Sequence, residues 1–296
     1  MASAEGQDIY LSSLKQFRKR SNIRQVVENF AEEIASHTMS NISNSCLASS
    51  VFRVLGVGSG HGKTDLRILN SVATAIESSQ KKKPVIHTAI IEPSDMIQEF
   101  KSSVTPLPQT LCSLADVSFE WHQKTFQQFI ASCPREDYFD MIHFVTSLYY
   151  MDAESSLKSS LKLLASGGAM FCILSSETSF FPKLAKKLKP DCVNLGSAKK
   201  IYTQMDVRKI SQRNNWKYEE LSRAHYSVDI SCCFDESSTE GGLLLDFLTH
   251  QENFRVNAES AVYREAMEFL SEECRVDENG AKFIQPEFAA VVIYKQ

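Results

Sequence analysis

Short apolar runs alternate with longer amphipathic runs from residue 51 to residue 174. The runs Val51–Val57 and Val85–Ile91 read as buried strands, and apolar residues recur at helical spacing between them, over Asp65–Ile76. Strands that alternate with helices pack as a parallel sheet with helices on both faces. The sequence therefore predicts an α/β fold built on a doubly wound sheet.

Three more strands are expected before residue 200, at Val117–Trp121, Phe139–Val145 and Ala169–Leu174, with a helix at Leu157–Leu164. Beyond residue 204 the pattern predicts helices at Asp206–Asn215, Gly242–His250 and Ala261–Glu272, and strands at Lys217–Leu221 and Phe288–Tyr294. Thr239–Gly242 and Asp277–Gly280 look like surface turns, and residues 9–47 look helical.

These elements predict a core and a cap. We expect the core over residues 51–200, with its final strands supplied by about 216–223 and 286–294. The cap is expected to come from both chain ends, over residues 1–50 and about 225–285.

Composition excludes several kinds of partner. A formal net charge of −4 gives no basic field for nucleic acid, and no stretch reaches the roughly 18–20 apolar residues of a membrane helix. The N-terminal residues lack the apolar run of a signal peptide. The eight cysteines form no CxxC pair, which argues against a zinc or thioredoxin-type site. We expect a cytoplasmic protein with reduced thiols, no metal, and no nucleic-acid or membrane partner.

Four glycines alternate over Gly56–Gly62, directly after a predicted strand and before a predicted helix. Glycine permits positive φ and lets a ligand approach the backbone closely, and a helix N-terminus favours polar or negative groups. A tight turn alone would need only one or two glycines. The run therefore indicates a ligand-binding loop.

Two nucleotide motifs fit this loop poorly. The dinucleotide fingerprint GxGxxG would need glycine where His61 stands. The phosphate loop GxxxxGKT would use Gly62, Lys63 and Thr64, but its first glycine would have to replace Val57. Asp140 precedes the run Met141–Val145, whereas the partner aspartate of such a loop closes its strand. A P-loop-like nucleotide-binding protein therefore stays as an alternative interpretation.

An acidic residue, Glu92, closes the second predicted strand. A carboxylate at this position can accept hydrogen bonds from both ribose hydroxyls of a nucleoside. The alternative is that Glu92 and Pro93 only start a helix, with Pro93 at its first position. Beside the glycine loop, we expect the ribose role.

Several runs resemble the histamine N-methyltransferase family, whose class I methyltransferase fold uses a GxGxG loop after the first strand. The resemblance extends from Tyr10 to Ile293. It rests on Val54–Leu69, Ile91–Ser94, Phe119–His122, Asp140–His143, Leu148–Tyr150, Val228–Phe234 and Leu244–Thr249.

The resemblance implies a Rossmann-like class I methyltransferase with a substrate-binding cap, which works as a monomer and uses S-adenosyl-L-methionine. The cofactor-binding residues that we expect are Gly58, Gly60, Glu92, Ile97, Thr125, Phe126 and Val145. At 97 and 126 this chain is apolar where the family has polar side chains.

The substrate positions depart further from the family. Ile23 stands where the family has an acidic residue for the substrate ammonium, and Thr146 stands where it has glutamine. A family asparagine falls near Pro286 and Glu287. Breaking a buried ion pair costs roughly 3–5 kcal/mol, so histamine would be a poor substrate unless Glu287 or Asp229 replaces the lost charge.

Aromatic residues are candidates for the walls of a substrate pocket. Tyr149 and Tyr150 follow the carboxyl end of a predicted strand, where open α/β sheets bind ligands. Phe17, Phe180, Phe181 and Phe247 could contribute to the same wall or belong to the core. The predicted substrate-binding set is Ile23, Thr146, Tyr149, Tyr150, Pro286 and Glu287.

The sequence therefore predicts an N-methyltransferase that acts on histamine or a similar imidazole amine. The alternatives are a carnosine-type histidine dipeptide N-methyltransferase and a non-catalytic cofactor-binding paralogue. Methyl transfer is an in-line displacement that needs orientation, so we expect no catalytic residue. His143 lies in an apolar strand and is expected in the core, and His61 is expected to be a solvent-facing spacer.

Overall fold

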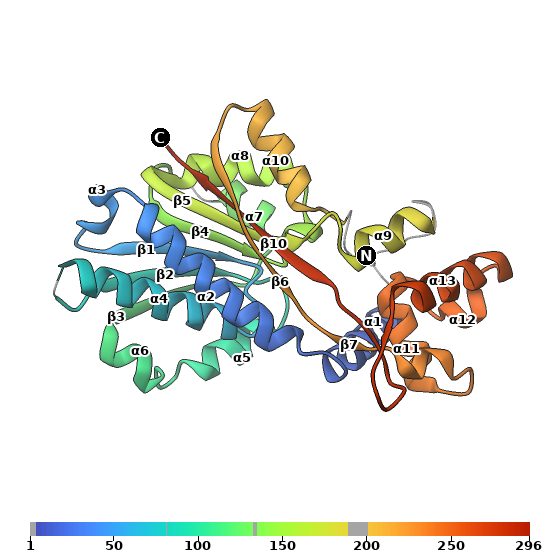
Figure 1. The fold of residues 1–296 in the computed structure, drawn as a ribbon. Helices are drawn as coiled ribbons and strands as arrows, with labels where there is room; N and C mark the ends of the chain where they lie inside the picture. The colour runs from blue at the N-terminus through green and yellow to red at the C-terminus, as the bar shows by residue number, and fades with distance from the viewer. Residues whose placement is uncertain (1–3, 81, 133–134, 189–200) are drawn as a thin grey trace. The chain divides into compact units, whose positions relative to one another are not determined.

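The computed structural model describes residues 4–80, 82–132, 135–188 and 201–296 (Figure 1). The chain forms two compact units. The cap unit comprises residues 1–26, 175–203 and 223–288, and the sheet unit comprises residues 27–174, 204–222 and 289–296. We describe each unit by itself, and the predicted core and cap boundaries stay a prediction.

A seven-stranded sheet with the order β3-β2-β1-β4-β5-β10-β6 organises the sheet unit. Its strands are β1 (Phe52–Val57), β2 (Val85–Ile91), β3 (Asp116–His122), β4 (Phe139–Val145), β5 (Leu164–Ser175), β6 (Lys217–His225) and β10 (Glu287–Tyr294). β1 pairs in parallel with β2 and β4, and the pairs β2–β3 and β4–β5 are also parallel. The predicted α/β class and its parallel strands are confirmed.

The sheet unit also contains helices. They are α2 (Ile23–Asn41), α3 (Asn44–Leu47), α4 (Lys63–Gln80), α5 (Met96–Ser103), α6 (Gln109–Leu114), α7 (Phe126–Ser132), η1 (Leu148–Tyr150), α8 (Ala153–Leu163) and α10 (Gln204–Arg213). α2 and α4 run across the face of the sheet turned to the viewer in Figure 1. α4 buries Leu69, Val72 and Ile76, as its helical spacing predicted.

The cap unit is built from helices and a small sheet of order β7-β9-β8. Its helices are α1 (Ala4–Lys19), α9 (Phe180–Lys187), η3 (Ser231–Phe234), α11 (Thr239–Thr249), α12 (Phe254–Asn257) and α13 (Ser260–Glu273). Its strands are β7 (Val228–Asp229), β8 (Arg275–Val276) and β9 (Lys282–Ile284).

The structure corrects two element boundaries. Thr239–Gly242 is the first turn of α11 and not a surface turn, because Ser238 caps the helix by accepting the Gly241 N–H at 3.0 Å. β5 begins at Leu164, five residues before the predicted start, and Gly167 continues the strand with a φ of +78°. The predicted turn at Asp277–Gly280 is confirmed by the Gly280 N–H donating to the Asp277 carbonyl.

None of the helices in the described part of the chain is long and apolar enough to span a membrane. Six described cysteines carry free thiols: Cys46, Cys112, Cys172, Cys232, Cys233 and Cys274. Cys133 and Cys192 lie outside the described residues.

Candidate active site

The glycine loop joins β1 to α4 where the strand order of the sheet reverses. β1 lies between β2 and β4, so the chain moves outward in one direction through β2 and β3 and in the other through β4 and β5. Open α/β sheets bind ligands at the carboxyl ends of the strands at such a reversal. The loop therefore lies at the expected ligand position of this fold.

Three of the four loop glycines are needed for packing within the protein: Gly56, Gly58, and Gly62, where an added Cβ would overlap the Phe100 ring. A Cβ on Gly56 would lie 2.5 Å from Asp65 Oδ1, and one on Gly58 would lie 2.5 Å from the Ser147 Cβ. Both separations are shorter than real Cβ contacts allow. Gly58 also has a φ of +72°, which favours glycine.

Gly60 differs from these three glycines. Its φ is +55°, and the atom nearest to an added Cβ would be Met96 Sδ at 3.9 Å. The space beside Gly60 is therefore open, and its backbone can be approached by a ligand.

Glu92 follows β2 and is held by three hydrogen bonds. The Gly60 N–H donates to its Oε2 at 2.8 Å, while the Ser94 N–H and hydroxyl donate to its Oε1 at 2.9 and 2.6 Å. Glu92 is 5% exposed. Ser94 was not among the predicted site residues, although a serine two residues after an acidic residue is a common local hydrogen-bond partner.

The other predicted cofactor residues follow the ends of neighbouring strands. Ile97 is buried on α5, after β2. Thr125 and Phe126 follow β3; the Thr125 hydroxyl accepts the Gln128 N–H at the start of α7, and Phe126 is buried. Val145 is the last residue of β4. All lie in the sheet unit, at the edge where β2, β3 and β4 end, and their cofactor roles stay a prediction.

Thr146 follows β4 with a φ of +51°. This left-handed conformation is strained for a β-branched residue and costs of order 1–3 kcal/mol. Such strain concentrates at functional sites, and it could not be predicted from the residue type at position 146. Tyr149 and Tyr150 lie three and four residues further on, in η1, and Tyr150 is 45% exposed.

The remaining predicted substrate residues lie in the cap unit, so their assignment to one site with Thr146 stays a prediction. Ile23 is the first residue of α2, and Pro286 accepts the Tyr226 N–H through its carbonyl. Glu287 begins β10.

Both carboxylates that could replace the family's acidic residue already have partners. Glu287 accepts from Arg223 at 2.8 Å and lies 3.2 Å from His225 Nε2. Asp229 accepts from Arg20 at 3.1 Å. Neither carboxylate is therefore an unpaired counterion for a substrate ammonium.

Three of the predicted aromatic residues meet within the cap unit. Phe17 stacks on Phe247 with ring centroids 4.2 Å apart, and Phe181 packs edge-on against both. Tyr226 and His250, which the sequence analysis missed, also pack on this cluster. Phe180 instead packs on Phe181 and Phe269.

His143 and His61 lie in different environments. His143 is buried within β4, as predicted, and burial lowers its pKa to about 3, so the ring is neutral. Its Nε2 lies 3.5 Å from Asp65 Oδ1. His61, expected to face solvent, is only 30% exposed and its Nδ1 lies 2.9 Å from Glu99 Oε2.

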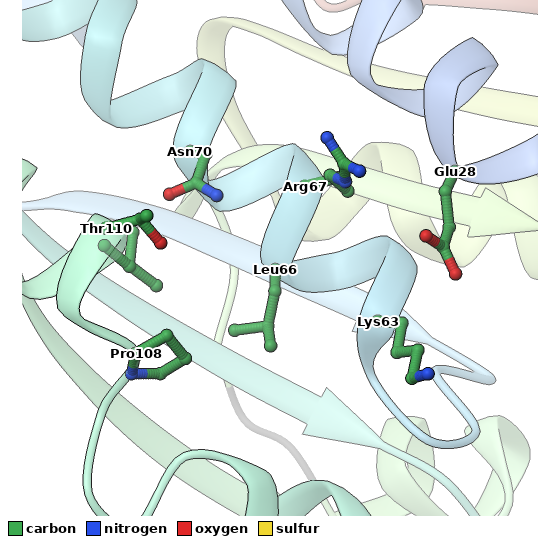
Figure 2. A pocket seen from close by; sticks show the side chains of 8 residues that line it. Glu28, Lys63, Leu66, Arg67, Asn70, Pro108 and Thr110 are labelled. Carbon is green, nitrogen blue, oxygen red and sulfur yellow. The ribbon is translucent and has the colours of Figure 1, made fainter. Parts of the chain in front are cut away.

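A hollow on the sheet unit is lined by Glu28, Lys63, Leu66, Arg67, Asn70, Pro108, Thr110 and Leu111 (Figure 2). None of these is a predicted site residue. Lys63, the lysine of the P-loop-like run, thus lines the flank of α4 together with Glu28 and Arg67. In a phosphate loop that lysine would instead reach the bound phosphates.

No family model matches the chain. Histamine N-methyltransferase from Danio rerio is 30% identical over 276 residues, covering 88% of this chain and 86% of the relative. Histamine N-methyltransferase from Xenopus tropicalis is 27% identical over 290 residues, covering 96% and 94%. Carnosine N-methyltransferase 2 from Gallus gallus is 28% identical over 277 residues, covering 92% and 82%.

Solved structures share the fold at low sequence identity. Loganic acid methyltransferase with SAH has a TM-score of 0.55 and 11% identity, covering 93% of each chain. The YcgJ protein from Bacillus subtilis has a TM-score of 0.52 and 13% identity, covering 88% of this chain and 98% of its own. The architecture is therefore that of Rossmann-like class I methyltransferases.

This fold places a glycine loop and an acidic residue at the strand-order reversal, and the Danio rerio enzyme matches most of the chain. The chain belongs to the histamine N-methyltransferase family and is an S-adenosylmethionine-dependent methyltransferase.

Proposed function

We propose that the protein transfers a methyl group from S-adenosyl-L-methionine to a ring or amine nitrogen of histamine or a histamine-like imidazole amine. The observation that carries this proposal is the similarity to histamine N-methyltransferases, which extends over 88–96% of the chain and so includes the cap unit. We also propose that the enzyme acts as a monomer in the cytoplasm.

The cofactor is assigned to the glycine loop and Glu92. The open space beside Gly60 admits a ligand close to the backbone, and the buried Glu92 carboxylate offers acceptors for ribose hydroxyls. Gly58, Ile97, Thr125, Phe126 and Val145 would complete the site; their places at the ends of β1 to β4 support this. These residue types fit an adenosyl group.

The residues of this chain act by orientation. The bound cofactor supplies a methyl group on a sulfonium centre. The loop and Glu92 hold the adenosyl end, and the acceptor site aligns a neutral nitrogen with the methyl carbon. Such alignment is worth roughly 7–11 kcal/mol of the barrier. A neutral imidazole or amine nitrogen is already nucleophilic, so the proposal assigns no general base and no covalent catalyst.

A histidine dipeptide such as carnosine is the second candidate acceptor. The position where the family has an acidic residue holds Ile23, and the carboxylates of Asp229 and Glu287 are paired with Arg20 and Arg223. Histamine would thus find no free carboxylate among these residues, so an acceptor held through groups other than its amine becomes the second candidate. The similarity to a carnosine N-methyltransferase supports the same candidate.

An acceptor screen with methyl-labelled S-adenosylmethionine tests the proposal. The panel contains histamine, carnosine, free histidine and biogenic amines without an imidazole. Turnover of histamine supports the first candidate, and turnover of carnosine alone supports the second. Cofactor binding without turnover of any imidazole compound would contradict both and support a non-catalytic paralogue. Titration with ATP in parallel tests the nucleotide-binding alternative.

Ile23→Glu tests the position of the substrate ammonium. A carboxylate there should lower the KM for histamine at least tenfold if residue 23 faces the amine, since a pairing charge is restored. Gln25→Glu is the matched control, because it adds the same charge two residues along α2 on an exposed side chain. Equal effects of the two variants would remove residue 23 from the substrate site.

A further inference from the structure

Asp65 is a buried carboxylate that the proposed cofactor site does not use directly. It lies in the first turn of α4 and is 3% exposed. Burial raises the pKa of its carboxyl group to about 7, against a hydrogen bond from Ser59 that favours the ionised form. A buried carboxylate is costly, so its presence calls for a compensating role.

The Asp65 carboxylate contacts the glycine loop through one side chain. The Ser59 hydroxyl donates to Asp65 Oδ1 at 2.7 Å, and Ser59 stands between Gly58 and Gly60. The next residue, Gly60, donates its N–H to Glu92. The turn of the loop is thus held by α4 through Ser59 and by the end of β2 through Glu92.

Gly56 leaves space for the hydrogen bond between Ser59 and Asp65 because it has no side chain. An added Cβ on Gly56 would lie 2.5 Å from Asp65 Oδ1, 2.6 Å from Ser59 Oγ and 3.1 Å from the His143 ring. Any larger residue at 56 would displace the hydrogen bond between Ser59 and Asp65. The first glycine of the loop is therefore required for this contact.

Among the groups around the Asp65 carboxylate, the Ser59 hydroxyl is the main stabilising partner. His143, from β4, lies 3.5 Å away, and burial keeps its pKa so low that it brings no positive charge. Glu92, after β2, is negative and raises the pKa of Asp65 further. A carboxylate in these surroundings is stabilised first by the Ser59 hydroxyl and second by its own backbone N–H.

We propose that Asp65 is a positioning residue for the cofactor: through Ser59 it holds the backbone of Gly58–Gly60 in the conformation that binds the adenosyl group. The inference rests on the proposed assignment of the glycine loop to the cofactor. Asp65 is buried and reaches the loop through Ser59, so its effect should appear in cofactor affinity and not in the recognition of the acceptor.

Ser59→Ala removes the contact with a small change in volume. We expect the Kd for S-adenosylmethionine, measured by isothermal titration, to rise about five- to tenfold, which corresponds to about 1–1.4 kcal/mol. The KM for the acceptor at saturating cofactor should stay within twofold. Ser59→Thr keeps a hydroxyl and should restore most of the affinity. Ser102→Ala, whose exposed hydroxyl donates to its own helix α5, is the matched control and should have no effect.

The pH dependence of cofactor affinity in Asp65→Asn is a second test, because a merely structural role of Asp65 would not change it. Ionised Asp65 is the stronger acceptor for Ser59, so cofactor affinity should fall as pH drops from 8 to 6. The cofactor's own ionisation affects both proteins equally. The ratio of the Kd of Asp65→Asn to that of the unmodified enzyme should therefore shrink toward low pH, and a constant ratio would contradict the proposal.

The outcomes separate this inference from the function on which it rests. Unchanged cofactor affinity in Ser59→Ala, with weakened affinity in Glu92→Ala, would overturn the positioning role and keep the cofactor site. Unchanged affinity in both variants would overturn the cofactor site as well. If Asp65→Asn fails to fold, the comparison of Ser59→Ala with Ser59→Thr still decides the question.

Discussion

The backbone N–H of Gly60 donates to Oε2 of Glu92 over 2.8 Å, although the two residues are 32 positions apart in the sequence. The other carboxylate oxygen is occupied by Ser94. Since each carboxylate oxygen can accept more than one hydrogen bond, Oε2 keeps an acceptor site beside the open space at Gly60. The carboxylate is thus fixed before any ligand arrives, which reduces the ordering cost of binding.

Glu92→Ala should raise the Kd for S-adenosylmethionine at least tenfold. The variant removes charge-assisted hydrogen bonds, which contribute about 1.5–3 kcal/mol each, and it frees the Gly60 N–H. Isothermal titration measures the effect. Ser94→Ala removes only one of the three bonds that hold the carboxylate and should weaken binding less. A Kd that stays the same in Glu92→Ala would remove this residue from the cofactor site.

Thr146→Gly should stabilise the fold while altering the acceptor site. The residue has a φ of +51°, which glycine adopts without strain, so relief of strain of about 1–2 kcal/mol exceeds the added chain entropy of about 0.5–1 kcal/mol. We expect the free energy of unfolding in urea to rise by up to about 1 kcal/mol.

Thr110→Gly is the control for that substitution. Thr110 is exposed in helix α6, so glycine there should destabilise by about 0.3–0.5 kcal/mol, the difference between the helix propensities of threonine and glycine. If both variants lose stability equally, Thr146 is not strained. A raised acceptor KM in Thr146→Gly, with unchanged cofactor affinity, would support its predicted place in the substrate site.

The strands and the loop could be predicted because their signals are local. Val85–Ile91 is mostly apolar, interrupted only by His87 and Thr88, and the apolar spacing of α4 follows directly from one buried helix face. Glu92 was predictable for the same reason, since it directly follows a strand that the pattern already defines.

Roles that depend on contacts between distant segments could not be predicted. Gly56 looks like a ligand glycine in the sequence, yet its missing side chain makes room for Asp65 and Ser59. Glu287 looked like a free replacement charge, yet Arg223 and the neighbouring His225 pair with it. Neither the packing around Gly56 nor the pairing of Glu287 produces a periodic pattern in the sequence.

Arg255→Ala should strongly destabilise the cap unit. Its guanidinium donates to five backbone carbonyls around the turn between η3 and α11, those of Cys232, Cys233, Asp235, Glu236 and Ser238. Losing these partners leaves polar groups unsatisfied, so we expect a loss of about 2–4 kcal/mol in urea unfolding.

Two variants sharpen the Arg255 prediction. Arg255→Lys should recover little, because one ammonium cannot reproduce the planar fork of donors. Arg264→Ala, at an exposed position of α13, removes the same charge from the same unit and should change stability by less than about 0.5 kcal/mol. Comparable losses of stability in Arg255→Ala and Arg264→Ala would contradict the prediction that the hydrogen bonds of Arg255 stabilise the cap unit.

Glu120→Gln should make the stability of the fold less dependent on acid pH. Burial alone would raise the pKa of Glu120, but two hydrogen bonds from Arg135 and one from His87 lower it to about 2, from an ordinary value of 4.5. Because the folded pKa lies below the unfolded one, this stabilisation is fully present above about pH 4.5 and is lost as pH falls toward 2. The difference in unfolding free energy between the unmodified protein and Glu120→Gln, measured in urea from pH 3 to 7, should therefore be largest above pH 5 and shrink below pH 4.

Asp116→Asn is the control for this prediction. Asp116 lies on the same strand as Glu120, and the variant breaks only its exposed ion pair with Lys83, so it should have little effect on stability at any pH. A difference for Glu120→Gln that does not vary with pH would show that the carboxylate is not held in its ionised form by Arg135 and His87.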